Sequence, residues 1–271
     1  MARLVPKAIT FDVYGTLIDW EGEIQDYFKR FLDKKGITSA TPYQVQQRWE
    51  VLQFDYIKTY RPYRQVLKDT LAITCRDFGF DFTDEDCTEF SETMAHWRAF
   101  PDTVEAIKEL RKYTKCVMLT NTDNDIIRQT LGNAGIEVDD IITAEDAQCY
   151  KPNHGGFLLS QKKLGLTVDE MMHAGFGFKY DVIPGNELGY RTIWVNRQGI
   201  CRPIDDVTGE LLKYCREDIM CGDLKTLAYI IKGMHATDVE NGEAKFKKVH
   251  IKSGTRFAVR FFVRIKLYNS S

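Results

Sequence analysis

The sequence lacks the residue patterns that point to a disulfide-bonded or zinc-binding protein. Its seven cysteines are scattered, and no two of them are spaced as Cys-x-x-Cys. The five histidines are also scattered and never form a His-x-x-x-His pair. Because a disulfide framework or a zinc site needs closer clustering, we expect reduced cysteines. Any metal site would have to be built from carboxylates.

The chain also has little net charge and no long apolar run. Thirty-seven Lys and Arg residues against 39 Asp and Glu residues give a net charge of −2, which argues against a dedicated nucleic-acid-binding protein. No run approaches the roughly 20 apolar residues of a membrane-spanning helix, and residues 1–7 carry no apolar signal segment. We therefore expect a cytoplasmic globular protein. A content of 44% hydrophobic residues over 271 positions is typical of a globular protein with a sizeable core.

Short apolar runs rich in β-branched residues recur along the chain, and each is followed by a helical pattern. Runs without polar alternation are typical of strands buried on both faces of a parallel sheet. The predicted strands are residues 8–11, 116–119, 141–143, 172–176 and 192–195, and the predicted helices between them are residues 102–112, 123–134, 154–164 and 182–188. This alternation predicts an α/β fold with a doubly wound parallel sheet.

One long stretch, from Trp20 to Trp97, breaks the alternation. It contains only amphipathic helical patterns, at residues 23–34, 42–60, 64–78 and 83–96. We expect an all-helical cap domain of residues 19–97, inserted into an α/β core domain made of residues 1–18 and 98–232. Ligands of open α/β sheets bind beyond the carboxyl ends of the strands. A cap that enters after the first strand would therefore cover the ligand and exclude water.

Residues 233–271 differ from the rest and form a basic C-terminal extension. From Lys245 to Tyr268 there are eight Lys or Arg residues and no acidic residue, and apolar side chains alternate as in a strand. Ser253 and Gly254 are suited to a hairpin turn. We interpret the segment as a terminal hairpin or a poorly ordered extension, and a basic interaction arm is the alternative.

Polar side chains follow four of the predicted strands. Asp12 ends the first strand, and Thr120 and Asn121 end the second. Lys151 follows the third strand after a loop, and Asp181 lies beyond the fourth. Each of them alone would most often be a cap or turn residue. Because the carboxyl ends of parallel strands meet at one edge of a sheet, we expect these groups to converge there as an active site.

In this order the motifs resemble those of the haloacid dehalogenase superfamily. The resemblance rests on Asp-x-x-Gly-Thr-Leu from Asp12, a run ending in Thr120-Asn121, a Lys151-Pro152 pair and the acidic fourth motif, and it covers about residues 7–232. It implies that Asp12 is a nucleophile that forms a covalent intermediate. Thr120 would orient its carboxylate, Lys151 would offset the negative charge, and Asp181 would hold Lys151 or position the attacking water.

Two positions distinguish the branches of that superfamily. Phosphatases carry an acid–base Asp two residues after the nucleophile and a magnesium-binding Asp in motif four, where this sequence has Tyr14 and Phe176. Phosphoryl transfer normally needs such a metal, whereas a metal on Asp12 would withdraw charge from a nucleophile that attacks carbon. The Asp-Val-Tyr-Gly-Thr-Leu motif, with Val13 and Tyr14, closely resembles that of L-2-haloacid dehalogenases. We therefore expect no metal and no cofactor.

The sequence departs from that branch where a cap arginine would receive the substrate or the leaving halide. An ungapped fit around Trp49 places Glu50 at this position, with Arg48 nearby. We take Arg48 as the candidate for the missing positive charge, and Arg61 and Arg64 are the alternatives.

Three aromatic residues also stand where that branch has polar ones. Phe157 replaces a tyrosine, and Phe176 and Phe178 replace a serine and an asparagine. We expect these rings either to line the substrate pocket, together with Val13 and Tyr14, or to pack in the core.

The leading hypothesis is the hydrolytic dehalogenation of a small 2-haloalkanoic acid through an aspartyl ester on Asp12. One alternative is a phosphatase of the same superfamily, in which Asp181 or another carboxylate would bind magnesium. Another is a catalytically weak relative. The expected partner is a small halogenated carboxylic acid, not nucleic acid or a membrane, and a homodimer is compatible with the sequence.

Overall fold

The computed structural model describes residues 4–201 and 216–242, so the predicted hairpin or basic arm lies outside the described residues. Within the described part, parallel strands form one six-stranded sheet in the order β3-β2-β1-β4-β5-β6. The strands are Ala8–Phe11 (β1), Lys115–Thr120 (β2), Asp140–Thr143 (β3), Met171–Gly175 (β4), Arg191–Val195 (β5) and Ile219–Cys221 (β6). The doubly wound α/β fold is thus confirmed.

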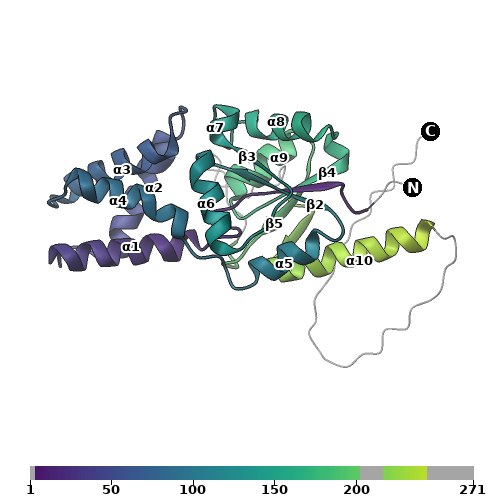
Figure 1. Ribbon diagram of the computed structural model, residues 1–271, viewed down its shortest axis with the longest axis horizontal. Helices are drawn as coiled ribbons and strands as arrows, with labels where there is room; N and C mark the ends of the chain where they lie inside the picture. Colours follow the sequence, from purple (N-terminus) through teal and green to yellow (C-terminus); the bar gives the residue numbers. More distant parts are fainter. Residues whose placement is uncertain (1–3, 202–215, 243–271) are drawn as a thin grey trace, which may run out of the picture.

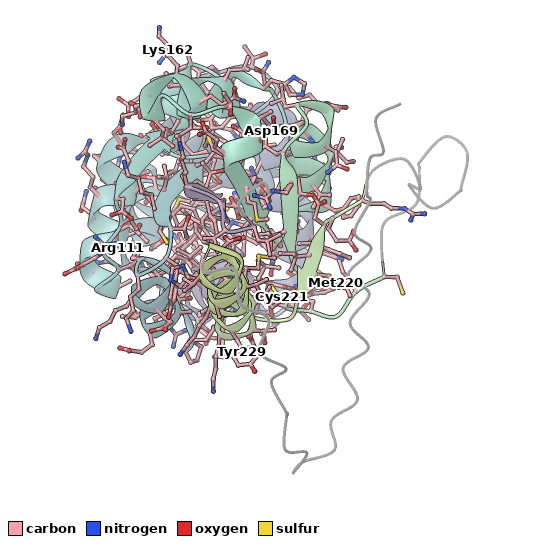
Figure 2. All side chains as sticks on the ribbon, turned by 90° about the vertical axis from the view of Figure 1, so that its right-hand side faces the viewer. Arg111, Lys162, Asp169, Met220, Cys221 and Tyr229 are labelled. Atoms are coloured by element: carbon pink, nitrogen blue, oxygen red, sulfur yellow. The ribbon has the colours of Figure 1, made fainter. Side chains whose placement is uncertain are left out.

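Five of these strands are the predicted apolar runs. β1 lies between β2 and β4 and is buried along its whole length. The order of the strands therefore reverses at β1, which is where open α/β sheets bind ligands. β6 was not predicted, because it has only three residues and its middle residue, Met220, is 58% exposed (Figure 2).

Helices cover both faces of the sheet. Successive side chains of β2 accordingly pack into two different hydrophobic clusters, one on each face. Cys116 and Met118 pack into the larger hydrophobic cluster, whereas Val117 and Leu119 pack into a second cluster on the opposite face. Helices α5 and α10 lie side by side under the sheet in Figure 1, and α7, α8 and α9 lie above it. The bounds of the core helices are Thr103–Leu110 (α5), Asn124–Ala134 (α6), Ala144–Ala147 (α7), Gly155–Leu164 (α8), Ile183–Glu187 (α9) and Leu224–Gly242 (α10), with a short 3-10 helix at Val168–Glu170 (η2).

Helix α10 runs through the boundary predicted at residue 232. The carboxylate of Asp238, in its later turns, accepts hydrogen bonds from the backbone N–H groups of Leu4 and Val5 at 2.9 Å each. The helix therefore stays attached to the chain segment that leads into β1. Within the described residues, the core continues to Gly242.

The segment between β1 and α5 is entirely helical, as predicted. It consists of α1 (Trp20–Lys35), α2 (Pro42–Tyr56), α3 (Tyr63–Phe78), α4 (Asp84–Thr93) and the 3-10 helix η1 (Met94–His96). Thr41 and Thr83 begin α2 and α4 with capping boxes, and Gly36 and Gly79 end α1 and α3 in the left-handed conformation. Helix α2 ends at Tyr56, four residues before its predicted end at Tyr60.

The helical block packs around its own aromatic core and lies at the side of the sheet toward which β1 runs (Figure 1). Phe28, Trp49 and Phe90 contact one another there, and the indole N–H of Trp49 donates to Thr70. Two backbone hydrogen bonds, from Asp19 N to Arg98 O and from Phe100 N to Leu17 O, join the chain entering the block to the chain leaving it. This arrangement places the block over the carboxyl ends of the strands. Of the helices in the described ranges, none is long and apolar enough to cross a membrane.

Candidate active site

Asp12 follows directly after β1, and a tight turn after it supplies its first partner. The carbonyl of Val13 accepts three backbone N–H groups, from Thr16, Leu17 and Ile18, and Gly15 adopts a φ of 96° that favours glycine. The turn brings the Thr16 hydroxyl to 2.7 Å from Oδ2 of Asp12. Sequence reasoning missed Thr16 as a site residue, although it belongs to the Asp-x-x-Gly-Thr-Leu motif.

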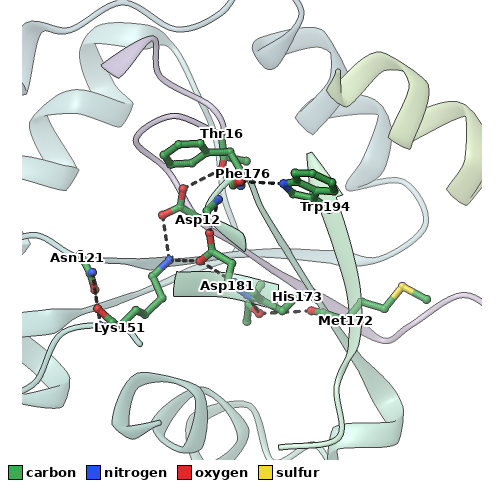
Figure 3. A network of polar contacts seen from close by, with 11 residues as sticks. Asp12, Thr16, Asn121, Lys151, Met172, His173, Phe176, Asp181 and Trp194 are labelled. Atoms are coloured by element: carbon green, nitrogen blue, oxygen red, sulfur yellow. Dashed lines mark hydrogen bonds and ion pairs between the residues drawn. The ribbon is translucent and has the colours of Figure 1, made fainter. Parts of the chain in front are cut away.

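Lys151 lies between two carboxylates, as the motif order predicts (Figure 3). Its Nζ is 2.9 Å from Oδ1 of Asp12 and 2.6 Å from Oδ1 of Asp181, and all three side chains are buried. Asn121 fixes the backbone of Lys151 from both sides, because its amide accepts from Lys151 N and donates to Lys151 O. The strand ends therefore converge on one ion-paired cluster.

Asp181 has two further partners besides Lys151. It lies in a short π-helix, η3 (Phe178–Val182), and its Oδ2 accepts the N–H of Gly177 at 3.0 Å. Its Oδ1 also lies 3.1 Å from Nε2 of His173 on β4. A Cβ on Gly175 would come within 2.2 Å of Oδ2, so the close approach of Asp181 to β4 requires glycine there.

Burial and mutual charge shift the pKa values of the three groups in different directions. Burial, with the nearby charge of Asp181, raises the pKa of Asp12 to about 6, although Lys151 opposes the shift. Burial would also raise the pKa of Asp181, but Lys151 and His173 hold it below its usual range. Burial would lower the pKa of Lys151, but both carboxylates raise it above its usual range. Lys151 is therefore a cation, and Asp12 is the carboxylate that takes up a proton first.

A small cavity of about 80 Å³ lies against Asp12 between the core and the helical block. Core residues and cap residues both contribute to its wall, and among the described residues that line it Lys151 is the one cation. The hydroxyl oxygen of Thr120 is buried and has no hydrogen-bond partner among the described residues. The complete lining is Asp12, Tyr14, Trp20, Gln53, Phe54, Ile57, Tyr63, Met94, Thr120, Asn121, Lys151, Phe176, Tyr180 and Asp181.

The chain matches the family of haloacid dehalogenase-like hydrolases over residues 6–189. It belongs to that family. It is 25% identical to haloacetate dehalogenase H-2 of Moraxella sp. (strain B), covering 71% of this chain and 87% of that relative. It is 26% identical to the (S)-2-haloacid dehalogenase of Pseudomonas sp. (strain YL), covering 71% of this chain and 84% of the relative.

Solved structures show the same fold. The L-2-haloacid dehalogenase from Xanthobacter autotrophicus with chloropropionic acid covalently bound superposes with a TM-score of 0.70 at 21% identity, over 84% of this chain and 99% of that one. A defluorinating L-2-haloacid dehalogenase superposes with a TM-score of 0.72 at 20% identity, over 84% and 95% of the two chains.

Tyr14 and Phe176 both line the cavity of this dehalogenase-like hydrolase. The Tyr14 hydroxyl lies 2.8 Å from that of Thr130, and burial raises its pKa, so it keeps its proton. The ring of Phe176 packs so closely on Gly15 that a Cβ there would lie 2.3 Å from Cε1 of the ring. Neither residue presents a carboxylate at the two positions where the family's phosphatases have one.

Three other predicted pocket residues do not line the cavity, and here the prediction is corrected. Val13 is fully buried in the larger core cluster. Phe157 faces the sheet from α8 and packs edge-on against His173 and Tyr190. Phe178 packs edge-on against Trp194, with ring centroids 5.2 Å apart. For Phe157 and Phe178 the core-packing alternative is therefore the one found.

The arginine prediction is also corrected. Arg48 pairs with Asp77 at 2.6 Å on the exposed side of α2 and does not line the cavity. Arg61 lies over the ring of Tyr56, and Arg64 pairs with Asp125 at 2.6 Å. None of the three candidates brings its charge to Asp12.

His173 is a buried polar partner that sequence reasoning did not single out. Besides its contact with Asp181, its Nδ1 lies 2.9 Å from the hydroxyl of Thr10 on the neighbouring strand β1. Burial lowers its pKa, although Asp181 opposes the shift. The ring is therefore neutral at neutral pH, with Nε2–H donating to Asp181 and Nδ1 accepting from Thr10. The sequence signal was a single histidine within an apolar run.

Proposed function

We propose that this hydrolase releases halide from carbon 2 of a small 2-haloalkanoic acid through an ester on Asp12. The observation that carries the proposal is the position of Asp12. Its carboxylate lies at the wall of a small, mostly apolar cavity, with one oxygen held by Lys151 and the other by Thr16. The (S)-2-haloacid dehalogenases among its relatives support the same chemistry.

In the first step, a carboxylate oxygen of Asp12 attacks carbon 2 from the side opposite the halogen. The carbon–oxygen bond forms as the carbon–halogen bond breaks, and the halide leaves with the electron pair. The hydrogen bonds from Lys151 and Thr16 hold the carboxylate in one orientation, which favours an in-line attack. The unpartnered hydroxyl of Thr120 is available as a donor to the substrate carboxylate.

In the second step, water attacks the carboxyl carbon of Asp12, because that carbon is the electrophile of the ester. The bond between this carbon and the oxygen attached to carbon 2 then breaks, and the 2-hydroxy acid leaves with that oxygen. One proton of the water goes to the departing oxygen and the other is released to solvent, which restores the carboxylate of Asp12. The Nζ of Lys151 is positioned to stabilise the oxyanion that develops on Oδ1. Asp181 holds Lys151 in place and helps to position the water. Carbon 2 is inverted once, so an L-2-haloacid gives a D-2-hydroxy acid.

Two side chains favour displacement at carbon over phosphoryl transfer. The hydroxyl of Tyr14 is engaged with Thr130 and lacks the acidity of a general acid at neutral pH. Phe176 places an aromatic ring, not a carboxylate, beside Asp12. An apolar wall suits an alkyl halide better than a multiply charged phosphate ester.

The test is a single turnover with enzyme in excess over a 2-haloacid in heavy-oxygen water. We expect the label in the peptide that contains Asp12 and not in the hydroxy acid, because the product oxygen comes from Asp12. Direct incorporation of label into the product would mean that water attacks carbon 2 itself, and it would refute the ester. Halide release from a panel of 2-haloacids, beside a phosphate ester with magnesium, tests the reaction class.

A further inference from the structure

A second, larger cavity of about 360 Å³ adjoins the reaction cavity. Trp20 and Phe176 line both cavities, so these two rings form the boundary between them. Helix α2 runs along both: Gln46 and Glu50 line the larger cavity, and Gln53 lines the smaller one. The spacing of these positions places them on one face of the helix. The larger cavity is therefore an extension of the same cleft between the core and the cap.

Gln46 contributes a buried amide to this wall. The side chain is 3% exposed, and its Oε1 is buried without a hydrogen-bond partner among the described residues. Buried polar atoms are nearly always paired, and leaving one unpaired costs free energy. The terminal torsion of glutamine is soft, so the amide can turn its oxygen toward the cavity that the residue lines. The site is suited to a ligand that donates a hydrogen bond.

The charge of the lining is negative. Asp19, Glu21 and Glu50 line the cavity together with one cation, Arg197. The Arg197 guanidinium is already neutralised by Asp102, at 3.0 Å and 3.3 Å. Its charge is therefore satisfied by a residue of the core, which leaves the carboxylates of the lining in excess.

Glu50 is the carboxylate with the fewest contacts of its own. Asp19 accepts from Gly22 N and Glu21 accepts from Gln198, whereas Glu50 has no hydrogen bond or ion pair with any described residue. Burial, together with the charge of Glu21, raises its pKa to about 7. A cation beside Glu50 would stabilise its ionised form and so oppose both the cost of burial and the repulsion from Glu21.

We propose that this cavity binds a primary alkylammonium group, with its N–H groups donating to Glu50 and Gln46. The rings of Trp20 and Phe176 would cover the alkyl part and attract the cation through their faces. No three His, Cys, Asp or Glu residues in the described ranges come together as a metal site, which favours an organic cation over a metal ion. The proposal concerns binding and holds or fails independently of halide release by Asp12.

The test is calorimetric titration of the full chain with butylammonium, 1-butanol and tetramethylammonium. Butylammonium has both charge and N–H donors, 1-butanol has a donor without charge, and tetramethylammonium has charge without a donor. We expect butylammonium to bind at one site and the other two probes to bind at least roughly tenfold more weakly. Equal binding of 1-butanol and butylammonium would overturn the proposal.

Variants locate the site. Glu50→Gln keeps the size of the side chain and should weaken butylammonium binding roughly tenfold or more, and Gln46→Leu should weaken it as well. Glu92→Gln, the same change at an exposed position of α4, is the matched control and should have no effect. Thermal melting of each variant confirms that it is folded. Unchanged affinity in folded Glu50→Gln would refute the assignment.

The dependence on pH gives a second readout. The cation pairs with ionised Glu50, so affinity should rise about tenfold between pH 6 and pH 8 as a group with a pKa near 7 loses its proton. The other charged groups at Glu50 are Glu21 and Asp19 on the side of α1, and Arg197, which stays paired with Asp102. Tyr180 on η3 keeps its proton, because burial raises its pKa to about 12. The rise should vanish in Glu50→Gln, and its persistence there would refute the role of Glu50.

Discussion

Nε2 of His173 and Nζ of Lys151 contact the same oxygen, Oδ1 of Asp181, at 3.1 Å and 2.6 Å. His173 comes from β4, whereas Lys151 comes from the loop before α8. One carboxylate oxygen thus accepts from both a neutral imidazole and a buried cation. This sharing fixes the position of Asp181, and through it the position of the ammonium that neutralises Asp12.

His173→Leu should lower the turnover rate without a large change in KM. The variant removes a donor from Asp181 while keeping an apolar side chain against Phe157, so the expected loss is about tenfold, the equivalent of roughly 1.4 kcal/mol. The lost hydrogen bond should also raise the pKa of Asp181. The acidic limb of the rate profile should stay near pH 6, because it reports the protonation of Asp12. His173→Gln, which retains a donor, should recover part of the rate. A turnover rate equal to wild type in His173→Leu would contradict this role of His173.

Asp12→Asn should fold normally and lose halide release by roughly 10³-fold or more, because an amide is a far poorer nucleophile than a carboxylate. Halide release by ion chromatography measures the loss, and circular dichroism confirms the fold. Mass spectrometry of the sample must exclude deamidation back to Asp12. Substantial activity in a pure sample would contradict the covalent mechanism.

The rate of ester formation should fall below about pH 6. Burial raises the pKa of Asp12 to about 6, and the carboxylate, not the acid, is the nucleophile. Lowering the pH through this value therefore protonates the nucleophile, and the rate should fall about tenfold per pH unit on the acid side. Single-turnover halide release from pH 4 to 8 measures it. A flat profile down to pH 4.5 would contradict the raised pKa.

Dehalogenation should be unchanged by a strong chelator. The prediction rests on Tyr14 and Phe176. They stand where the family's phosphatases have the Asp two residues after the nucleophile and the magnesium-binding Asp of motif four. Halide release is compared before and after chelation and after addition of magnesium. The phosphate ester assayed in parallel serves as the control. A clear magnesium requirement for either substrate would favour the phosphatase alternative.

Gly175→Ala should destabilise the protein by roughly 1–3 kcal/mol and abolish activity, because the new Cβ would come within 2.2 Å of Asp181. Gly132→Ala is the matched control. Gly132 lies in helix α6, and nothing approaches a Cβ there within 4 Å. This variant should be more stable by roughly 0.5–1 kcal/mol and keep full activity. Denaturant unfolding gives both values, and an active, equally stable Gly175→Ala would contradict the geometry of Asp181.

Local signals predicted most of the fold. β1 and β5 are continuous apolar runs that must be buried on both faces, and the helices of the cap carry their own capping residues and amphipathic faces. β6 was not predicted, because its three residues, with Met220 exposed, are too few to show the hydrophobic periodicity of a strand. The boundary at 232 was placed too early, because the contact between Asp238 and Leu4 is tertiary.

Motif order likewise predicted the polar cluster but not the lining of the cleft. Arg48 and Glu50 are two positions apart on α2, so their side chains point about 200° apart around the helix. Arg48 therefore faces Asp77 and Glu50 faces the cleft. Which of two neighbouring residues turns inward depends on how the helix packs, and proximity in the sequence does not reveal it.

Local periodicity, and the edge at which parallel strands finish, were enough to predict the alternation of strands and helices and the polar residues that end the strands. The atoms in contact follow from tertiary packing: one ammonium, Nζ of Lys151, reaches Oδ1 of Asp12, 139 positions away, and Oδ1 of Asp181. Tertiary packing also determines that His173 supports Asp181 and that Glu50, not Arg48, faces the cleft. Such contacts depend on the packing of whole elements, since hydrogen bonds and ion pairs require positions within about 3–4 Å.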